Sequence, residues 1–115
     1  MITFEEFKKI EIRAGKILSA EKIPDTDKLL KLSVDFGEKD PAGSAVPRQI
    51  VSGISLHFTD AAVLVGKTCM FVTNLEPRTI KGYESNGVLF AVSDSLGNFS
   101  LLEPSPTIHV GSLAG

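Results

Sequence analysis

The alternation of apolar and polar residues predicts that most of this chain forms β-strands. The clearest run is Leu30–Phe36, in which every second residue is apolar and the residues between are polar or charged. Because successive side chains of a strand point to opposite faces, such a run is expected to bury one face. The same alternation starts at Ile10, breaks at Gly15 and resumes at Ile17 on a shifted phase. A glycine inside a long strand predicts a β-bulge or a sharp bend at that point.

Further strands follow, separated by segments rich in glycine, proline, asparagine and aspartate. The strands are predicted at Arg48–Ile54, Lys67–Asn74, Val88–Val92 and, more briefly, Phe99–Leu102. Turns are predicted at Pro24–Asp27 and Ser95–Asn98, an exposed hairpin loop at Gly37–Pro47, and a loop from Leu75 to Gly87.

Two short helices are predicted. Thr3 and Glu6 form a capping box that starts a helix at about Phe4–Lys9, with Ile2 and Phe7 as the matching hydrophobic staple. This helix is too short to be stable alone, so we expect it to plug one end of a barrel. Thr59 or Asp60 can cap a second, small helix over Ala61–Leu64, ended by Gly66.

Five principal strands, with a small helix between the third and the fourth, are consistent with an all-β OB-fold, a five-stranded Greek-key barrel. Such barrels bind oligonucleotides through strands two and three and through the first-to-second and fourth-to-fifth loops. The pattern by itself supports only a small all-β barrel or sandwich. At 115 residues, the whole chain is expected to form a single domain, 1–115.

The composition indicates the cellular compartment in which the protein is expected. The chain contains one cysteine, Cys69, which excludes an intramolecular disulfide and is typical of a reducing cytosol. No apolar run approaches the ~20 residues needed to span a bilayer, and the amino terminus lacks the layout of a signal peptide. We therefore expect a cytoplasmic protein that does not associate with membranes.

The net charge of −2, from 12 basic and 14 acidic residues, argues against a nucleic-acid binder that uses its whole surface. A polyanion site would have to be a local patch. Residues 63–115 contain only three basic residues, and two of them, Arg78 and Lys81, stand in one predicted loop.

The candidate site combines cations with neutral hydrogen-bonding groups. Lys28 ends the first predicted loop, Arg48 begins the third strand, and Arg78 and Lys81 stand in the fourth-to-fifth loop, which are the ligand-binding places of an OB-fold. Lysine and arginine neutralise phosphates, and Asn74 and Ser85 can bond a base edge, a sugar hydroxyl or a phosphate. Each residue also has a purely structural explanation. Single surface cations are usually solvated, Asn74 can cap a turn, and Ser85 can be a turn residue.

Several motifs, in order along the chain, resemble the tRNA-binding domain family, which includes the appended domain or separate β subunit of methionyl-tRNA synthetase and free-standing tRNA-binding proteins. They are Phe7–Gly15, Asp27–Leu30, Arg48–Ile54, Gly66-Lys67, Asn74–Arg78 and Ser85–Gly87. The resemblance implies an OB-fold that binds tRNA largely through backbone and shape, homodimerisation of free-standing members, and RNA contacts by Lys28, Arg48, Asn74, Arg78 and Ser85. The chain departs from the family pattern at Val88, where methionine is common, and at Thr79, where a second basic residue often follows Pro-Arg.

Peptide binding and enzymatic activity are the two alternatives to tRNA binding. A related branch, the CsaA type, is described as a secretion-related chaperone that binds peptides, and Leu56, Phe58 and Val63 could supply an apolar patch for that purpose. An enzyme is disfavoured, because His57 and His109 are isolated and no nucleophile, metal or phosphate-loop motif is present, so no catalytic residue and no cofactor is expected.

The pattern of apolar residues in strands four and five also predicts a homodimer. Both alternating faces of Lys67–Asn74 and Val88–Val92 are apolar, and only one of them can face the barrel interior. We therefore expect the other face, with the carboxy-terminal tail, to meet a second copy. The alternative is that the tail packs back on its own barrel.

Overall fold

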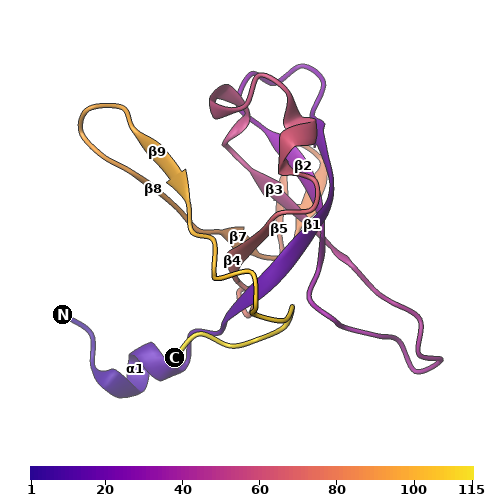
Figure 1. Ribbon diagram of the computed structural model, residues 1–115, viewed down its shortest axis with the longest axis vertical. Helices are drawn as coiled ribbons and strands as arrows, with labels where there is room; N and C mark the ends of the chain where they lie inside the picture. Colours follow the sequence, from indigo (N-terminus) through magenta and orange to yellow (C-terminus); the bar gives the residue numbers. More distant parts are fainter.

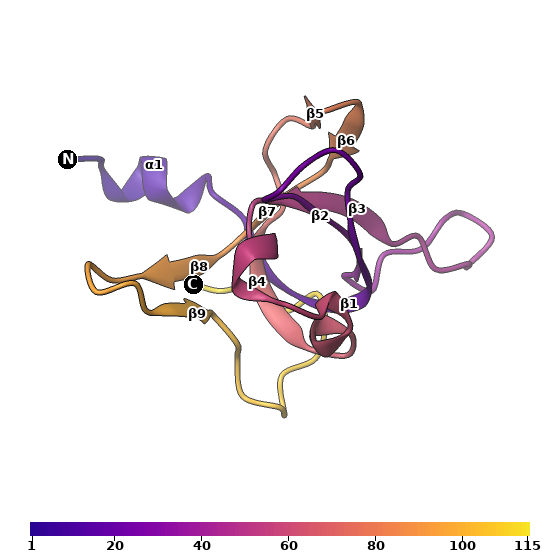
Figure 2. The ribbon, with the colours of Figure 1, turned by 90° about the horizontal axis from the view of Figure 1, so that it is seen from above.

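β1 (Ile12–Lys22) is the strand on which the barrel is built. In the computed structural model, which describes residues 1–115, it pairs with β2 (Leu30–Asp35) on one edge and with β4 (Thr68–Val72) on the other. β3 (Arg48–Ser52) and β7 (Val88–Leu89) extend the antiparallel sheet to the order β3-β2-β1-β4-β7 (Figure 1). Seen from above, the sheet curls into an almost closed ring (Figure 2). The predicted five-stranded, all-β barrel of the OB type is confirmed.

The barrel core follows the alternation that predicted it. The inward side chains of β2 are fully buried, and Phe71 of β4 packs edge-on against Phe36 with 5.3 Å between the ring centroids. Gly15 does not form the predicted bulge, since it pairs in register with Cys69 and the irregularity lies between Ile17 and Ser19. The reason for the glycine is space, because a Cβ there would lie 2.5 Å from the Phe36 ring.

Two 3₁₀ helices connect β3 to β4. The second, η2 (Ala61–Leu64), matches the predicted small helix, and Asp60 caps it by accepting a hydrogen bond of 3.0 Å from the Ala62 amide. The first, η1 (Ser55–His57), was not predicted.

The segment after β4 contains a hairpin where a loop was predicted. β5 (Arg78–Ile80) pairs with β6 (Tyr83–Ser85) through a two-residue turn in which Lys81 and Gly82 both have left-handed backbone, with φ of 51° and 84°. This is the turn type whose twist matches that of paired strands.

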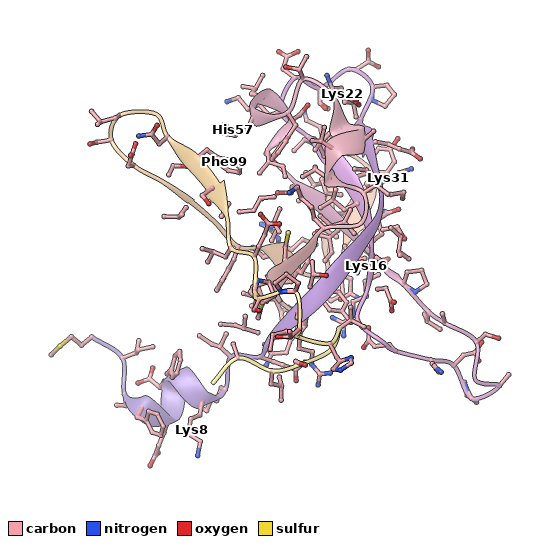
Figure 3. The ribbon with its side chains drawn as sticks, in the orientation of Figure 1. Lys8, Lys16, Lys22, Lys31, His57 and Phe99 are labelled. Carbon is pink, nitrogen blue, oxygen red and sulfur yellow. The ribbon has the colours of Figure 1, made fainter.

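The predicted strand Val88–Val92 is broken at Phe90. β7 ends in the barrel, and β8 (Ala91–Ser93) leaves it to form a projecting ribbon with β9 (Phe99–Leu101). Phe99 attaches the ribbon to η1, because its ring stacks on His57 with centroids 3.9 Å apart (Figure 3).

Helix α1 (Phe4–Lys8) has the predicted capping box but does not plug the barrel. Thr3 and Glu6 exchange both bonds of the box. None of the helical residues is buried, and the helix stands away from the barrel beside the carboxy terminus. The predicted staple is also not formed as a buried contact, since Ile2 and Phe7 are both exposed.

The carboxy-terminal tail packs back on its own barrel, as in the alternative weighed above. β2 pairs with β1 only from Lys16 onward, which leaves the earlier part of that edge without a strand partner. The tail fills this edge through hydrogen bonds from Ala14 N to Ser112 O, 3.0 Å, and from Gly111 N to Ala14 O, 2.7 Å. None of the chain's helical segments has the length and apolar content required to cross a membrane.

Phe71→Ala is expected to destabilise the protein by about 3–5 kcal/mol, because it removes a fully buried aromatic ring and leaves a cavity. Phe71 has no exposed surface, whereas Leu96 is 86% exposed, so Leu96→Ala is the control. Urea unfolding monitored by circular dichroism measures both. A loss below about 1 kcal/mol for Phe71→Ala would contradict the position given to β4.

Candidate nucleic-acid interface

The six predicted contact residues come from separate segments of the barrel, and Lys28 and Asn74 stand beyond opposite ends of β1. Lys28 lies in the loop between β1 and β2, Arg48 begins β3, and Asn74 follows β4. The other three belong to the β5–β6 hairpin, where Arg78 and Ser85 are register partners and Lys81 forms the turn.

The fold brings Lys28 and Lys81 to one place. Both line a shallow depression of about 370 Å³ between residues 25–29 and the tip of the hairpin, and Ile80 completes its lining. We call this the loop depression. Both lysines are exposed and neither forms a salt bridge. Their ammonium groups are therefore free to meet an anion.

Arg78 is also an exposed cation without a salt bridge. It stands at the base of the hairpin whose tip carries Lys81, three residues away along the chain. Lys28, Arg78 and Lys81 thus form a group of unpaired cations on the hairpin and the neighbouring loop, and we refer to them as the free cations.

Arg48 differs from the free cations because its charge is already paired. Its Nε and Nη2 donate to the two carboxylate oxygens of Glu38 at 2.7 and 2.8 Å, and its Nη1 donates to the Thr73 carbonyl at 2.6 Å. The side chain is 17% exposed, and the guanidinium lies 5.4 Å from the centre of the Phe36 ring. Hydrogen bonding to Arg48 lowers the pKa of Glu38, and the same bond raises the pKa of Arg48. Arg48 therefore ties β3 to the end of β4.

Asn74 joins the end of β4 to the segment before β1. Its Oδ1 accepts from the Glu11 amide at 2.8 Å and its Nδ2 donates to the Lys9 carbonyl at 2.6 Å. Glu11 accepts in turn from the Thr73 hydroxyl at 2.8 Å and from Arg13 at 2.7 Å, and these two bonds lower the pKa of Glu11. Both hydrogen-bonding ends of the Asn74 amide thus have partners within the chain.

Ser85 is inside the wall of the barrel, only 2% exposed. Its hydroxyl accepts from the Val51 amide at 2.9 Å and donates to the Gly87 carbonyl at 3.1 Å. The next residue, Asn86, donates its amide to the Gln49 carbonyl at 2.8 Å. Ser85 and Asn86 therefore fasten the hairpin to β3.

Two further residues, on β2 and β6, were not predicted as part of the candidate site. Lys31 of β2 places its Nζ 5.5 Å from the centre of the Tyr83 ring of β6, and 3.5 Å from Glu21. It lies on the flank of the barrel formed by β1 and β2, with Lys16 and Lys22 (Figure 3). The alternation of Leu30–Phe36 already turned Lys31 outward, which is the signal that could have found it. Tyr83 has no such signal, because its segment is predicted to be a loop and not a strand.

Comparisons with known proteins show the family to which the chain belongs. A sequence model of the family described as "Putative tRNA binding domain" matches residues 12–113. The matched region contains every strand of the barrel, both sides of the loop depression and most of the tail.

Curated relatives are much longer proteins. The methionine–tRNA ligase of Chloroherpeton thalassium is 41% identical over 110 residues, which cover 96% of this chain and 15% of the ligase. The chain therefore spans about 15% of the length of the curated relatives it matches.

Solved structures of similar length share the whole fold. The MetRS-related protein from Pyrococcus horikoshii has a TM-score of 0.87 at 34% identity, over 100% of this chain and 98% of that chain. The chaperone CsaA of Bacillus anthracis has a TM-score of 0.82 at 25% identity, over 100% and 99% of the two chains. By the family match across residues 12–113 and by these relatives, the chain belongs to the tRNA-binding domain family.

Proposed function

We propose that this protein binds tRNA through the free cations Lys28, Arg78 and Lys81, in a chain whose net charge is −2. The observation that carries the proposal is that these three cations are exposed, unpaired and placed on the first loop and the fourth-to-fifth hairpin of an OB-type barrel. Membership of the family supports tRNA as the polyanion.

We assign Arg48, Asn74 and Ser85 a positioning role within this proposal. A direct RNA contact that displaced any of their internal hydrogen bonds would have to compete with the bonds described above. Removing one partner of such a bond leaves a polar group of the barrel unsatisfied, which costs about 1–3 kcal/mol. Their contribution to binding is to hold the hairpin and the strand ends that present the free cations.

The wider role in this proposal is that of a cytoplasmic, free-standing cofactor or β subunit of methionyl-tRNA synthetase. The supporting observations are the similarity to an appended part of methionine–tRNA ligases and the full-length similarity to a MetRS-related protein of the same size. In that role the chain would raise the affinity of a synthetase for tRNA and would perform no chemistry itself.

Peptide binding is the second candidate, favoured by the similarity to the chaperone CsaA and by the exposure of Leu56 and Val63. The two functions respond differently to salt. Phosphate binding weakens steeply as salt rises, whereas binding through apolar surface does not weaken. A salt titration against total tRNA and against an unfolded polypeptide therefore distinguishes them.

We also propose a homodimer in which α1 and the end of the tail form the contact. Phe4 and Phe7 are 71% and 46% exposed, and with Ile10 and Ile12 they line a groove of about 390 Å³ that ends at Ala114 and Gly115. A second copy related by a two-fold axis would cover this apolar surface on both chains.

Replacing the free cations is expected to weaken tRNA binding and to leave the melting temperature nearly unchanged. In Lys28→Ala, Arg78→Ala and Lys81→Asn, each lost phosphate contact should flatten the log–log salt slope by about 0.7–0.9 units. Asparagine is chosen at Lys81 because it tolerates the left-handed turn better than alanine. Filter binding at several salt concentrations measures the slope. An unchanged slope in all three variants would remove these residues from the interface.

Glu38 should make stability depend on pH, because its pKa is lowered in the folded state by Arg48. The unfolded chain then binds the proton more readily, so this contribution is complete above about pH 4.3, the ordinary pKa of glutamate, and is lost as pH falls through the lower folded pKa. Glu38→Gln is expected to lower the urea midpoint at pH 7 and to reduce its change between about pH 5 and about pH 3. Glu76→Gln, at an exposed glutamate without a salt bridge, is the control. Parallel pH profiles for the two variants would contradict a stabilising role of the Arg48–Glu38 ion pair.

The double variant Phe4→Ser, Phe7→Ser is expected to sediment as a monomer at a protein concentration where the wild type is dimeric. Neither side chain is buried within its own chain, so the melting temperature of the monomer should change little apart from the loss of dimer linkage. Leu96→Ser, at an exposed residue of the projecting ribbon, is the matched control. A variant that still sediments as a dimer would place the contact elsewhere.

A further inference from the structure

We propose that the loop depression holds one unpaired nucleotide of the bound RNA, with its base against the apolar floor and its flanking phosphates beside Lys28 and Lys81. The inference rests on the proposed function and names the part of the RNA that this surface takes. It predicts a preference for RNA that offers an unstacked base over RNA that is continuously paired.

The size of the depression suits a single nucleotide. Its volume of about 370 Å³ lies in the range of about 300–1,000 Å³ that small-ligand sites occupy. A continuous A-form helix keeps its bases stacked inside and presents only phosphates, 2′-hydroxyls and shallow base edges. Such a helix could lie across the depression but could not fill it.

The floor of the depression is apolar. Leu29 and Ile80 are half-buried and form its hydrophobic lining, one from the loop and one from the hairpin. A phosphate would gain nothing from this floor, whereas the face of a base would be removed from water on it.

The charged residues around the floor also favour a whole nucleotide over a phosphate alone. Asp25 and Asp27 stand beside Lys28 and Lys81, so the formal charge of the four groups sums to zero, and no salt bridge joins any of them. A site for phosphate alone would be weakened by the two carboxylates. Carboxylates accept hydrogen bonds from the amino groups of bases and from hydroxyls, so a whole nucleotide uses both signs of charge.

The backbone at the depression is also held in an uncommon conformation. Asp25 and Lys81, with φ of 62° and 51°, are the chain's two non-glycine residues with positive φ, and both line the depression. Left-handed backbone is unfavourable for residues with a side chain, and strained residues cluster at binding sites. Here one such residue comes from the loop between β1 and β2 and the other from the turn of the hairpin.

The test compares two RNA probes with equal numbers of phosphates, a hairpin with an unpaired loop and a blunt duplex, by fluorescence anisotropy at one salt concentration. The wild-type protein is expected to bind the hairpin at least about tenfold more tightly, because a base stacked on a side-chain platform contributes about 1–3 kcal/mol. Equal affinity for the two probes would overturn the inference and leave the proposed function standing. Failure to bind either probe would overturn the proposed function, and this inference with it.

Two variants separate base recognition from charge. Ile80→Ser should remove most of the hairpin preference and leave duplex binding unchanged, with Thr79→Ser, on the other face of the hairpin, as the matched control. Asp27→Ala removes a negative charge, so a site for phosphates alone would bind both probes more tightly. We expect weaker binding of the hairpin, because an acceptor for the nucleotide is lost. Glu5→Ala, in the helix α1, controls for net charge. Tighter binding of both probes by Asp27→Ala would overturn the inference.

Discussion

The structure depends on a seam at which the barrel closes without a β-ladder. β3 and β7 are the two ends of the sheet, and Ser85, Asn86 and Gly87 join them. The Ser85 hydroxyl and the Asn86 amide bond to the backbone of β3. Gly87, with φ of 144°, passes so close that a Cβ would lie 2.9 Å from Ile50 and 3.1 Å from the Val72 carbonyl. Only glycine fits this crossing, and the seam therefore fixes both where the barrel closes and where the β5–β6 hairpin starts.

In the structure, three of the motif residues form internal hydrogen bonds, while three of the predicted cations do not form salt bridges. Arg48, Asn74 and Ser85 are side chains whose chemistry would suit RNA, but each is bonded to backbone groups of a neighbouring segment. The free cations lie outside these bonds, on the β5–β6 hairpin that Ser85 fastens to β3 and on the loop between β1 and β2. A motif can therefore identify the family, and under the proposed function it marks the scaffold of the site rather than the residues that contact the ligand.

The sequence allowed the barrel to be predicted because its signal is local. Alternation in Leu30–Phe36, the cap at Asp60 and the turn at Pro24–Asp27 each act within a few residues, and each was confirmed. The strand Val88–Val92 was predicted as one piece, since no residue in it marks the point at which the chain leaves the barrel. The β5–β6 hairpin was missed because its turn uses Lys81-Gly82, and lysine is not a usual residue for left-handed backbone.

The site was harder to predict because its geometry depends on partners distant in sequence. Nothing in the order of residues shows that Arg48 forms an ion pair with Glu38, ten residues away. Nor does it show that Asn74 bonds to Lys9 and Glu11. Whether a cation is free or paired is decided by tertiary contacts. The placement of Lys28 and Lys81 in one depression could be predicted only through the fold class, which states which loops of an OB-type barrel meet.

A protein with a net charge of −2 cannot attract RNA through its overall field, so what binding it has must come from contacts made at short range. Interactions between exposed charges are largely screened beyond about 8 Å at physiological salt. Free cations must then stand where phosphates will be, and a mobile loop would hold them there only part of the time. The bonds of the seam, the Arg48–Glu38 pair and the tight turn at Lys81 limit this motion. Under the proposed function, the rigidity of the hairpin would take the place of a large positive surface in binding RNA.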